Sequence, residues 1–331
     1  MADLPKIFEE LLGLAVENGA SDVHLKAGRP ALMRVAGELV EAEMAPLTAE
    51  LLHAFVDATL PTRFRDRWVR DSQVDYSFDR MAQGKGRFRV NAFLQRNQPA
   101  AVLRLVKVKP PQFAELNLDE KTMLQALELM EGLVLVCGPT GSGKSSTIAA
   151  MLRHVNEHSA LHVITLEDPV EYVYADERSS FSQREIGIDV ESFPMGLRAA
   201  LRQDPDVILV GEMRDLETIH AAIEAAETGH VVFGTLHTNG ASSTVNRIID
   251  VFPQEQQDQI RTQLSTALIG VLSQTLLPRK PSGMCAAYEL MVVTPAISNL
   301  IRENKTYRID SSIQTGRKHG MFLMDDSLFK L

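Results

Sequence analysis

A glycine-rich segment has the residue types and the spacing that bind phosphate. Residues 138–145, GPTGSGKS, fit the pattern G-x-x-x-x-G-K-[ST], with an apolar run before them and a helical pattern after them. Glycines let the backbone curl so that several N–H groups point into one hollow, and a helix that starts there adds its positive end. A chance match in a strand–turn–helix is the alternative, but motif and context together favour a phosphate-binding loop. Its residues are Gly138, Pro139, Thr140, Gly141, Ser142, Gly143, Lys144, Ser145 and Ser146.

A carboxylate follows the apolar run at residues 207–210. In an open α/β sheet, ligands bind at the carboxyl ends of the strands, so Glu212 is expected beside the terminal phosphate. There it can orient or deprotonate an attacking water. Many phosphate-loop proteins carry an aspartate before this glutamate to hold the metal, whereas this chain has Gly211. Mg²⁺ is therefore expected to bind the Ser145 hydroxyl, Glu212 and other nearby acids.

A second apolar run, residues 163–166, also ends in acids. Glu167 and Asp168 follow it, so they too are expected at the carboxyl edge of the sheet, with Glu167 as a further metal or nucleotide contact. For Asp168 a supporting role at the nucleotide competes with a simpler one. Because Pro169 comes next, Asp168 can be a turn residue.

Two histidines lie at the two ends of the predicted strand 231–236. His237, at the carboxyl end, falls on the same edge as the phosphate-binding loop and is interpreted as a phosphate sensor or a subunit contact. His230 lies at the other end, roughly 20 Å away at about 3.3 Å per residue. The two histidines therefore cannot easily share one metal ion, and a structural role is the main interpretation for His230.

Two arginines are expected to face each other across a hairpin. Segments 87–93 and 101–106 alternate in polarity about a loop at 95–99, which places Arg89 opposite Arg104. Like charges directly opposite one another destabilise a hairpin unless they are solvated or share an anion. A solvated face is one interpretation. The other is that bound ATP supplies the anion, as arginines from another domain or subunit do in phosphoryl transfer.

The elements that must position these residues fall into two domains. Residues 1–106 mix helical and alternating segments, which predicts a small α+β domain. The basic, proline-containing stretch KVKPP begins a predicted linker at 107–114. Residues 115–331 alternate between apolar strands and helices, which predicts an α/β domain with a parallel sheet covered on both faces. The expected strands are 133–137, 162–166, 207–210 and 231–236, and the expected helices are 145–157, 192–203 and 215–228.

The composition limits the function classes. The chain has 331 residues, of which 45% are apolar, and a net charge of -9, which argues against a nucleic-acid translocase. No apolar run reaches the ~18 residues of a membrane-spanning helix, and the acidic N-terminus lacks a secretory signal. We therefore expect a cytoplasmic protein with no direct membrane insertion. Its two cysteines are too few for a four-cysteine zinc site.

Four longer segments together resemble the type IV pilus retraction ATPases of the secretion-ATPase superfamily. They are GPTGSGKSS (138–146), ITLEDPVEY (164–172), RQDPDVILVGEMRD (202–215) and AETGHVVFGTLHTN (226–239). They are similar to the family's Walker A motif, Asp box, atypical Walker B motif and His box. In addition, SDVHLKAG (21–28) and GRFRVNAF (86–93) are similar to its PAS-like N-terminal domain.

The resemblance implies an α/β, RecA-like P-loop ATPase domain behind a PAS-like domain. It implies ATP and Mg²⁺ at 138–145, Glu212 as the catalytic glutamate, and Glu167 and Asp168 as supporting acids. It matches His230 and His237 to the His-box histidines, and Arg89 and Arg104 to arginines that approach ATP. The implied assembly is a homo-hexameric ring, peripheral at the inner membrane, which acts on a pilus platform protein alongside related pilus ATPases.

One segment departs from the family pattern. The motif AIRNLIRE reads AISNLIRE at residues 296–303, so Ser298 stands in place of an arginine.

The alternative outside the motor class is a regulatory subunit that binds ATP without productive turnover.

Overall fold

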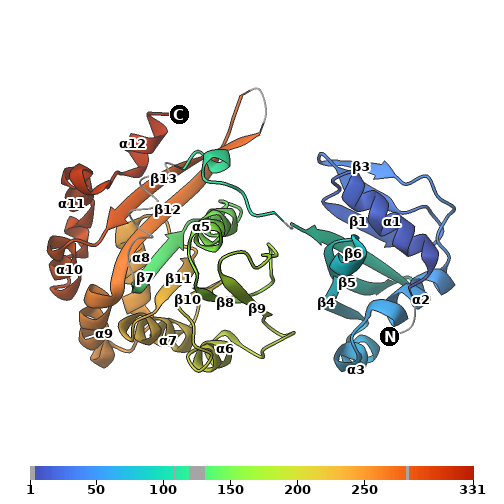
Figure 1. Ribbon diagram of the computed structural model, residues 1–331, viewed down its shortest axis with the longest axis horizontal. Coiled ribbons are helices and arrows are strands. Elements are labelled where there is room, and N and C mark those ends of the chain that lie inside the picture. Colours follow the sequence, from blue (N-terminus) through green and yellow to red (C-terminus); the bar gives the residue numbers. More distant parts are fainter. Residues whose placement is uncertain (1–3, 108, 119–130, 281–282) are drawn as a thin grey trace. The chain divides into compact units, whose positions relative to one another are not determined.

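A computed structural model of the chain describes residues 4–107, 109–118, 131–280 and 283–331. The chain divides into two compact units, residues 1–108 and residues 109–331. Each unit has its own sheet and its own helices, as Figure 1 shows.

The first unit is an antiparallel sheet covered by helices. In the described residues its six strands run in the order β3-β2-β1-β6-β5-β4. Phe8, Leu12 and Phe55 from the helices α1 and α2 join the same buried core as Phe88 and Leu103 from the sheet. The elements are α1 (Lys6–Glu17), β1 (Asp22–Lys26), β2 (Leu32–Val35), β3 (Glu38–Glu41), α2 (Ala49–Thr59), α3 (Arg65–Asp71), β4 (Gln73–Asp79), β5 (Arg87–Gln95) and β6 (Gln98–Val106).

The hairpin of β5 and β6 has the predicted register but a tighter turn. Arg89 pairs with Arg104, as expected, whereas the predicted loop 95–99 is wrong because Gln95 pairs with Gln98. Only Arg96 and Asn97 remain in the turn, with φ of 51° and 58°. Two residues of positive φ form the turn whose twist matches that of the flanking strands. The asparagine tolerates this conformation, so the strands can continue up to the turn.

The second unit contains a largely parallel sheet. In the described part of the chain its seven strands have the order β13-β12-β7-β11-β10-β8-β9, and only the edge strand β13 is antiparallel to its neighbour. The strands are β7 (Gly132–Cys137), β8 (His162–Glu167), β9 (Ser180–Glu185), β10 (Val207–Val210), β11 (Val231–Leu236), β12 (Leu268–Pro278) and β13 (Met284–Val292). Every residue of β7 and β10 is buried, which is why these strands are continuous apolar runs.

Helices cover this sheet on both faces (Figure 1). Side chains of α5 pack with alternate residues of β7 such as Val134 and Val136. Leu133 and Leu135, which point to the other face, pack with most of the remaining helices. The helices are α5 (Lys144–His158), α6 (Phe193–Ala200), α7 (Leu216–Glu227), α8 (Ala241–Asp250), α9 (Gln254–Ala267), α10 (Pro295–Arg302), α11 (Ile309–Thr315) and α12 (Met324–Leu328). The predicted α/β class with a smaller N-terminal α+β unit is confirmed.

Ser298, which departs from the family pattern, has a clear structural role. Its hydroxyl donates a hydrogen bond of 2.6 Å to the carbonyl of Ser265 in the last turn of α9. Carbonyls in the last turn of a helix have no partner within the helix, so this hydroxyl satisfies one of them. The two neighbouring apolar residues of α10, Ile297 and Ile301, are fully buried beneath it.

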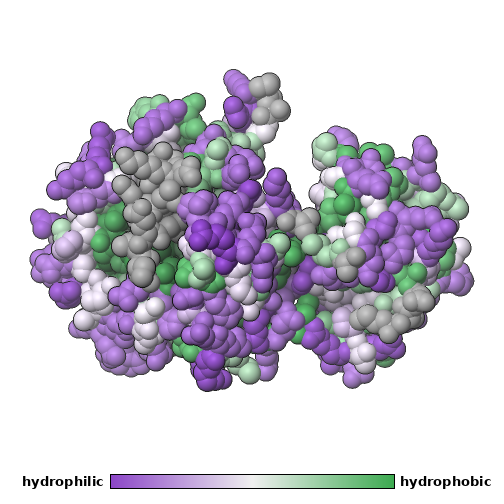
Figure 2. Space-filling model, viewed as in Figure 1, coloured by the Kyte–Doolittle hydropathy of each residue, from purple (hydrophilic) through white to green (hydrophobic). Residues whose placement is uncertain are grey.

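The surface is mostly hydrophilic on the face shown in Figure 2, where apolar residues appear only in small areas. Among the described residues, no helix combines the length and the apolar character needed to cross a bilayer.

Candidate active site

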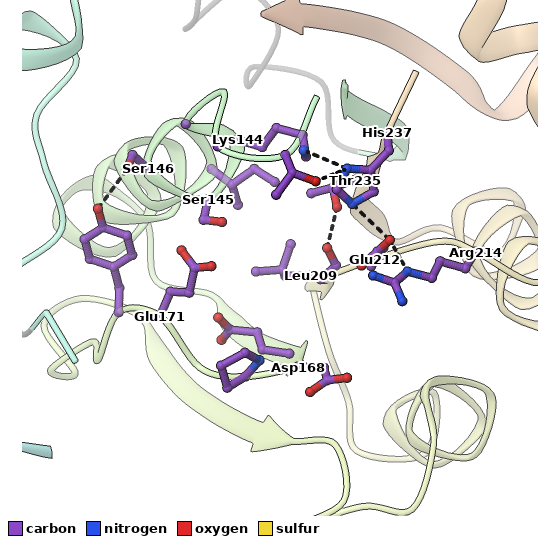
Figure 3. Close-up of a pocket in the computed structure, with 18 of the residues that line it drawn as sticks. Lys144, Ser145, Ser146, Asp168, Glu171, Leu209, Glu212, Arg214, Thr235 and His237 are labelled. Atoms are coloured by element: carbon purple, nitrogen blue, oxygen red, sulfur yellow. Dashed lines mark hydrogen bonds and ion pairs between the residues drawn. The ribbon is translucent and has the colours of Figure 1, made fainter. Parts of the chain in front are cut away.

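A cavity of about 420 Å³ opens at the carboxyl ends of the central strands of the second unit. The phosphate-binding loop and the first turn of α5 form one wall, and residues that follow β8, β10 and β11 form the others (Figure 3). The parallel sheet thus brings together residues up to 97 positions apart in the sequence, as the rule for α/β folds predicts. Its polar lining includes Thr140, Lys144, Ser145, Ser146, Glu167, Asp168, Glu171, Tyr172, Glu212, Arg214, Thr235 and His237.

The glycines of the loop are required by close packing as well as by backbone conformation. Gly138 has φ of 149°, and a Cβ there would lie 2.2 Å from the carbonyl oxygen of Gln274. Gly143, with φ of 89°, is the residue that precedes α5. Any side chain at Gly138 would push the loop away from β12, so the loop is shaped by its fit against the neighbouring strand as well as by its own sequence.

Lys144 lies over the loop rather than in solvent. Its ammonium donates hydrogen bonds of 2.8 Å to the carbonyl of Gly138 and 3.1 Å to that of Pro139. Burial lowers the pKa of Lys144, and the negative charges of Glu212 and Glu171 oppose this effect. The two carbonyls hold the ammonium at the mouth of the loop, where phosphate oxygens can replace them as acceptors.

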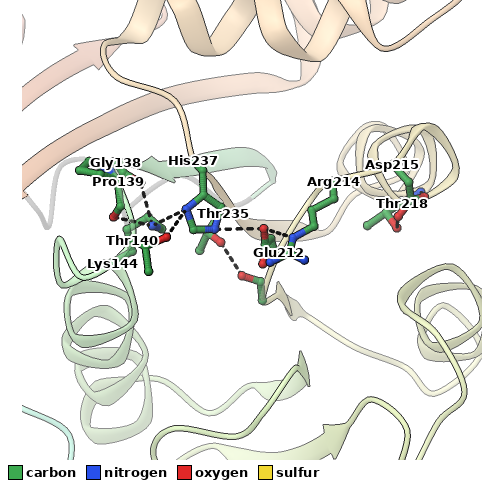
Figure 4. Close-up of polar contacts among 11 residues, drawn as sticks. Gly138, Pro139, Thr140, Lys144, Glu212, Arg214, Asp215, Thr218, Thr235 and His237 are labelled. Atoms are coloured by element: carbon green, nitrogen blue, oxygen red, sulfur yellow. Dashed lines mark hydrogen bonds and ion pairs between the residues drawn. The ribbon is translucent and has the colours of Figure 1, made fainter.

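His237 connects the loop to Glu212. Its Nε2 lies 3.0 Å from Glu212 Oε1, and its Nδ1 lies 3.5 Å from the ammonium of Lys144 and 3.4 Å from the hydroxyl of Thr140 (Figure 4). Because an ammonium only donates, Nδ1 accepts and Nε2–H donates to the carboxylate. Arg214 donates to the same oxygen of Glu212 through Nε. The carboxylate is thereby fixed between a histidine and an arginine.

Gly211 occupies the position where many phosphate-loop proteins carry an aspartate, and the structure shows why. Its N–H donates to the carbonyl of Leu166 at 2.8 Å, and Thr235 donates to its carbonyl oxygen. A Cβ at Gly211 would lie 3.0 Å from the Leu166 oxygen and 3.2 Å from Glu167 Cα. The chain following β10 therefore passes close to the end of β8, and a side chain at this position would require the two segments to move apart by a few tenths of an ångström.

Two residues that were not selected from the sequence, Glu171 and Tyr172, also line the cavity. In Figure 3 the exposed carboxylate of Glu171 points towards Ser145. The hydroxyls of Tyr172 and Ser146 lie 2.8 Å apart, which ties this segment to the first turn of α5. Their signal in the sequence was their position just after Glu167 and Asp168, in the chain that leaves the carboxyl end of β8.

The oxygen donors fit a magnesium ion held together with phosphate. Among the described residues, no three His, Cys, Asp or Glu side chains are placed to hold a metal ion by themselves. The cavity nevertheless contains the hydroxyl of Ser145 and the carboxylates of Glu171, Glu212 and Asp168. Mg²⁺ commonly binds one or two protein oxygens and completes its shell with substrate phosphates and water, so this donor set suits it.

Comparison with known proteins agrees with this geometry. The family described as type II/IV secretion system protein matches residues 2–325. The chain belongs to the type II/IV secretion system protein family.

Individual relatives are similar over nearly the whole chain. The type IV pilus retraction ATPase PilT of Pseudomonas aeruginosa is 46% identical over 316 residues, which cover 96% of this chain and 91% of the relative. A twitching motility protein of Neisseria gonorrhoeae is 44% identical, over 91% of this chain and 80% of the relative. A crystal structure of the pilus retraction motor PilT with bound ADP superposes with a TM-score of 0.88 at 44% identity, covering 100% of this chain and 93% of that one.

Not every predicted residue of this family member lies in the cavity. His230 lies at the far end of β11, where its Nδ1 is 2.9 Å from the carbonyl of Ala225 near the end of α7. Arg89 and Arg104 belong to the first unit. Arg104 donates to the carboxylate of Asp22 at 3.0 Å, and Asp22, on the adjacent strand, is paired with it in register. A protein carboxylate therefore supplies a negative charge beside this arginine pair.

Glu167 is placed differently from the other acids. It is buried, and its Oε1 accepts hydrogen bonds from Thr165 at 2.6 Å and from Gln183 at 3.2 Å. Burial raises its pKa to about 7, although these hydrogen bonds act in the opposite direction. A carboxyl group that is partly protonated near neutral pH is a weaker metal ligand than the exposed Glu171, so the predicted metal role of Glu167 remains a prediction.

Replacing Glu167 by glutamine is expected to change how stability depends on pH. The pKa of this group rises from 4.5 to about 7 on folding, so the unfolded chain loses its proton first as the pH increases. The group's contribution is therefore most favourable below about pH 4.5, and it declines by about 3 kcal/mol as the pH rises through 7. Between pH 4 and pH 8, we expect the free energy of unfolding of the variant to rise by about 3 kcal/mol relative to that of the parent protein. Urea unfolding measures this difference. Glu177→Gln, at an exposed position, is the control, and a pH-independent difference for Glu167→Gln would contradict the assignment.

Proposed function

We propose that this protein hydrolyses ATP and uses the energy to power retraction of a type IV pilus. The observation that carries the proposal is the row of contacts from Lys144 through His237 to Glu212, because it links the phosphate-binding loop to a fixed carboxylate. The relatives described as pilus retraction and twitching motility proteins support the biological role.

Binding of the triphosphate uses groups of the loop that already converge. The backbone N–H groups of the loop and the amino end of α5 attract phosphate oxygens. The ammonium of Lys144 exchanges its two loop carbonyls for oxygens of the terminal phosphates, which are stronger acceptors because they are charged. When bound, Mg²⁺ neutralises phosphate charge, and Ser145 with Glu171 or Glu212 would hold it.

Glu212 is proposed to activate the attacking water. A carboxylate at the carboxyl end of a central strand can accept a proton from water or orient it for attack. His237 and Arg214 both donate to Glu212, which holds the carboxylate in one orientation. His237 also contacts Lys144, so movement of the ammonium towards phosphate changes the hydrogen bonding of His237 and, through it, that of Glu212. We propose that His237 reports phosphate binding in this way.

The proposed assembly is a homo-hexameric ring in the cytoplasm, peripheral at the inner membrane. In this assembly the PAS-like first unit and the RecA-like second unit shift relative to one another as ATP is bound and cleaved. The ring acts on an inner-membrane pilus platform protein and works alongside related pilus ATPases. Similarity to PilT over both units supports this proposal.

Arg89 and Arg104 are proposed to approach ATP within the ring. Arginines supplied from outside the phosphate-binding domain stabilise the charge of the phosphoryl-transfer transition state and contribute large rate factors. We expect Arg89→Ala and Arg104→Ala each to lower the rate of ATP hydrolysis by about 10-fold or more. The unfolding temperature is measured alongside, because Arg104→Ala also removes the partner of the buried Asp22. Arg34→Ala, on β2 of the same sheet, is the control. If both variants hydrolyse ATP at the parent rate, these arginines serve only the fold of the first unit.

The proposal as a whole is tested by measuring phosphate release together with solution mass. The purified chain is incubated with Mg²⁺–ATP, and its mass is determined by light scattering with and without nucleotide. Phosphate release by a ring-sized assembly is the expected result. A monomer that hydrolyses ATP at its full rate would remove the motor proposal, and nucleotide binding without any turnover would indicate a regulatory subunit.

A further inference from the structure

The hairpin formed by β12 and β13 lies directly beside the strand that leads into the phosphate-binding loop. Ser273 of β12 pairs with Cys137, the last residue of β7, and on its other side with Glu289 of β13. The next pair along the hairpin is Gln274 with Tyr288. Because successive residues of a strand point to opposite faces of the sheet, the side chains of these two adjacent pairs lie on opposite faces of it.

On one face, Gln274 holds the phosphate-binding loop. Its side chain is only 2% exposed, and its Nε2 donates a hydrogen bond of 2.5 Å to the carbonyl of Ser142. Ser142 is equally buried, and its own hydroxyl has no hydrogen-bond partner among the described residues. The Gln274 amide is also 3.1 Å from the point where a Cβ of Gly143 would lie. One buried amide thus supports the part of the loop that precedes α5.

On the other face, Glu289 and Ser273 hold the start of α8. The buried Glu289 accepts a hydrogen bond of 2.8 Å from the N–H of Ala241, the first residue of α8. The hydroxyl of Ser273 accepts one of 3.0 Å from the N–H of Gly240. A carboxylate at the amino end of a helix is favourable, because it satisfies free N–H groups and complements the helix dipole.

The start of α8 in turn fixes His237. Only residues 238–240 separate this histidine from the helix, so the place where α8 begins restrains the position of His237. The hydroxyl of Thr238 in this connection lies 2.7 Å from that of Thr244 in α8, and Thr244 also donates to the sulfur of Cys137 at the base of the loop. The connection is therefore bound to both the hairpin and β7.

We propose that the β12–β13 hairpin is the positioning element of the hydrolysis site, with Gln274 setting the shape of the phosphate-binding loop and Glu289 setting the position of His237. The two residues sit at adjacent positions of one hairpin, so a single rigid element sets the relative position of the groups that bind phosphate and the group that contacts Glu212. This inference rests on the proposed ATP hydrolysis and adds two residues that do not line the cavity.

The first test measures nucleotide affinity in the full-length chain. A fluorescent ATP analogue with Mg²⁺ is titrated against Gln274→Leu, which keeps the side-chain volume and removes the donor, and against Gln274→Glu, which places an acceptor against the Ser142 carbonyl. We expect the affinity to fall about 5- to 10-fold for leucine and further for glutamate, with KM rising in parallel and kcat within about 2-fold. Thr275→Val, the next residue of β12, is the control.

The second test measures turnover. Glu289→Leu removes the acceptor at the start of α8 and is expected to lower kcat about 10-fold while the affinity for the ATP analogue changes less than 2-fold. Glu289→Gln keeps an acceptor oxygen and should restore most of the rate, which loss of packing alone would not explain.

The outcomes separate this inference from the function on which it depends. If the parent protein releases no phosphate, the proposed function is wrong. Thermal unfolding shows whether the Gln274 and Glu289 variants are folded. If the parent protein is active and the folded variants have the same kcat and KM as the parent, the positioning proposal is overturned. It is equally overturned if, in both sets of variants, kcat falls and KM rises together and these changes are proportional to the loss of stability.

Discussion

Glu212→Gln is expected to stop ATP turnover while ATP still binds. Removing a general base or water-orienting group costs about 10²- to 10⁴-fold in rate, and glutamine cannot take a proton from water. Glutamine has the same shape and keeps an oxygen that can accept from His237 or Arg214, so the fold should be undisturbed. The rate is measured as phosphate release, and binding as titration of a fluorescent ATP analogue with Mg²⁺.

The matched control is Glu217→Gln, an exposed glutamate in the first turn of α7, five residues along the chain. It should hydrolyse ATP at the parent rate. A Glu212→Gln variant that releases phosphate within 3-fold of the parent would show that another group activates the water. Arg214→Ala keeps the carboxylate of Glu212 but removes a partner that fixes its orientation. This variant therefore tests the orientation of the carboxylate separately from its presence.

Lys144→Ala is expected to have the second largest effect, on affinity. A hydrogen bond from an ammonium to a charged phosphate oxygen contributes about 1.5–3 kcal/mol, which corresponds to roughly 10- to 100-fold in Kd. Alanine also removes one of the two contacts that His237 makes with the loop and leaves the one with Thr140, so turnover at saturating ATP should fall too. Titration with the fluorescent ATP analogue gives the affinity, and phosphate release gives the turnover.

Lys305→Ala provides the comparison for the lysine, because the ammonium of Lys305 is partly exposed and, among the described residues, pairs only with the exposed Glu303. Its effect on ATP binding should be negligible. Unchanged affinity in Lys144→Ala would mean that the loop backbone alone binds the phosphates. The role of Lys144 as a phosphate ligand would then be excluded.

The pattern of the sequence was sufficient to predict the layout of the second unit around the cavity. Apolar runs such as 207–210 and 231–236 coincide with β10 and β11. A parallel strand that is buried on both faces forms an uninterrupted apolar run, which can be recognised in the sequence. In contrast, β9 was not predicted. Its residues, SFSQRE, are mostly half-buried at the edge of the sheet and lack a continuous apolar run.

The hairpin of β12 and β13 shows a different limit of prediction. Gln274 and Glu289 are polar residues within strands, and neither belongs to a recognised motif. Their importance comes from which strand lies next to β7, and strand order depends on pairings between segments more than 100 residues apart. Local patterns contain no information on such pairings, so only the folded structure could select these two residues.

The sequence by itself determined the chemistry of this protein, and the tertiary structure decided how each group is used. The spacing of Gly138, Lys144 and Ser145 defines a phosphate site wherever a strand and a helix flank it, because the required backbone shape is local. The raised pKa of Glu167 and the tight packing around Gly211 depend instead on neighbours from other strands. Burial and close approach are properties of the packed fold, and they distinguish Glu167 from Glu212, although each of these carboxylates follows an apolar run in the sequence.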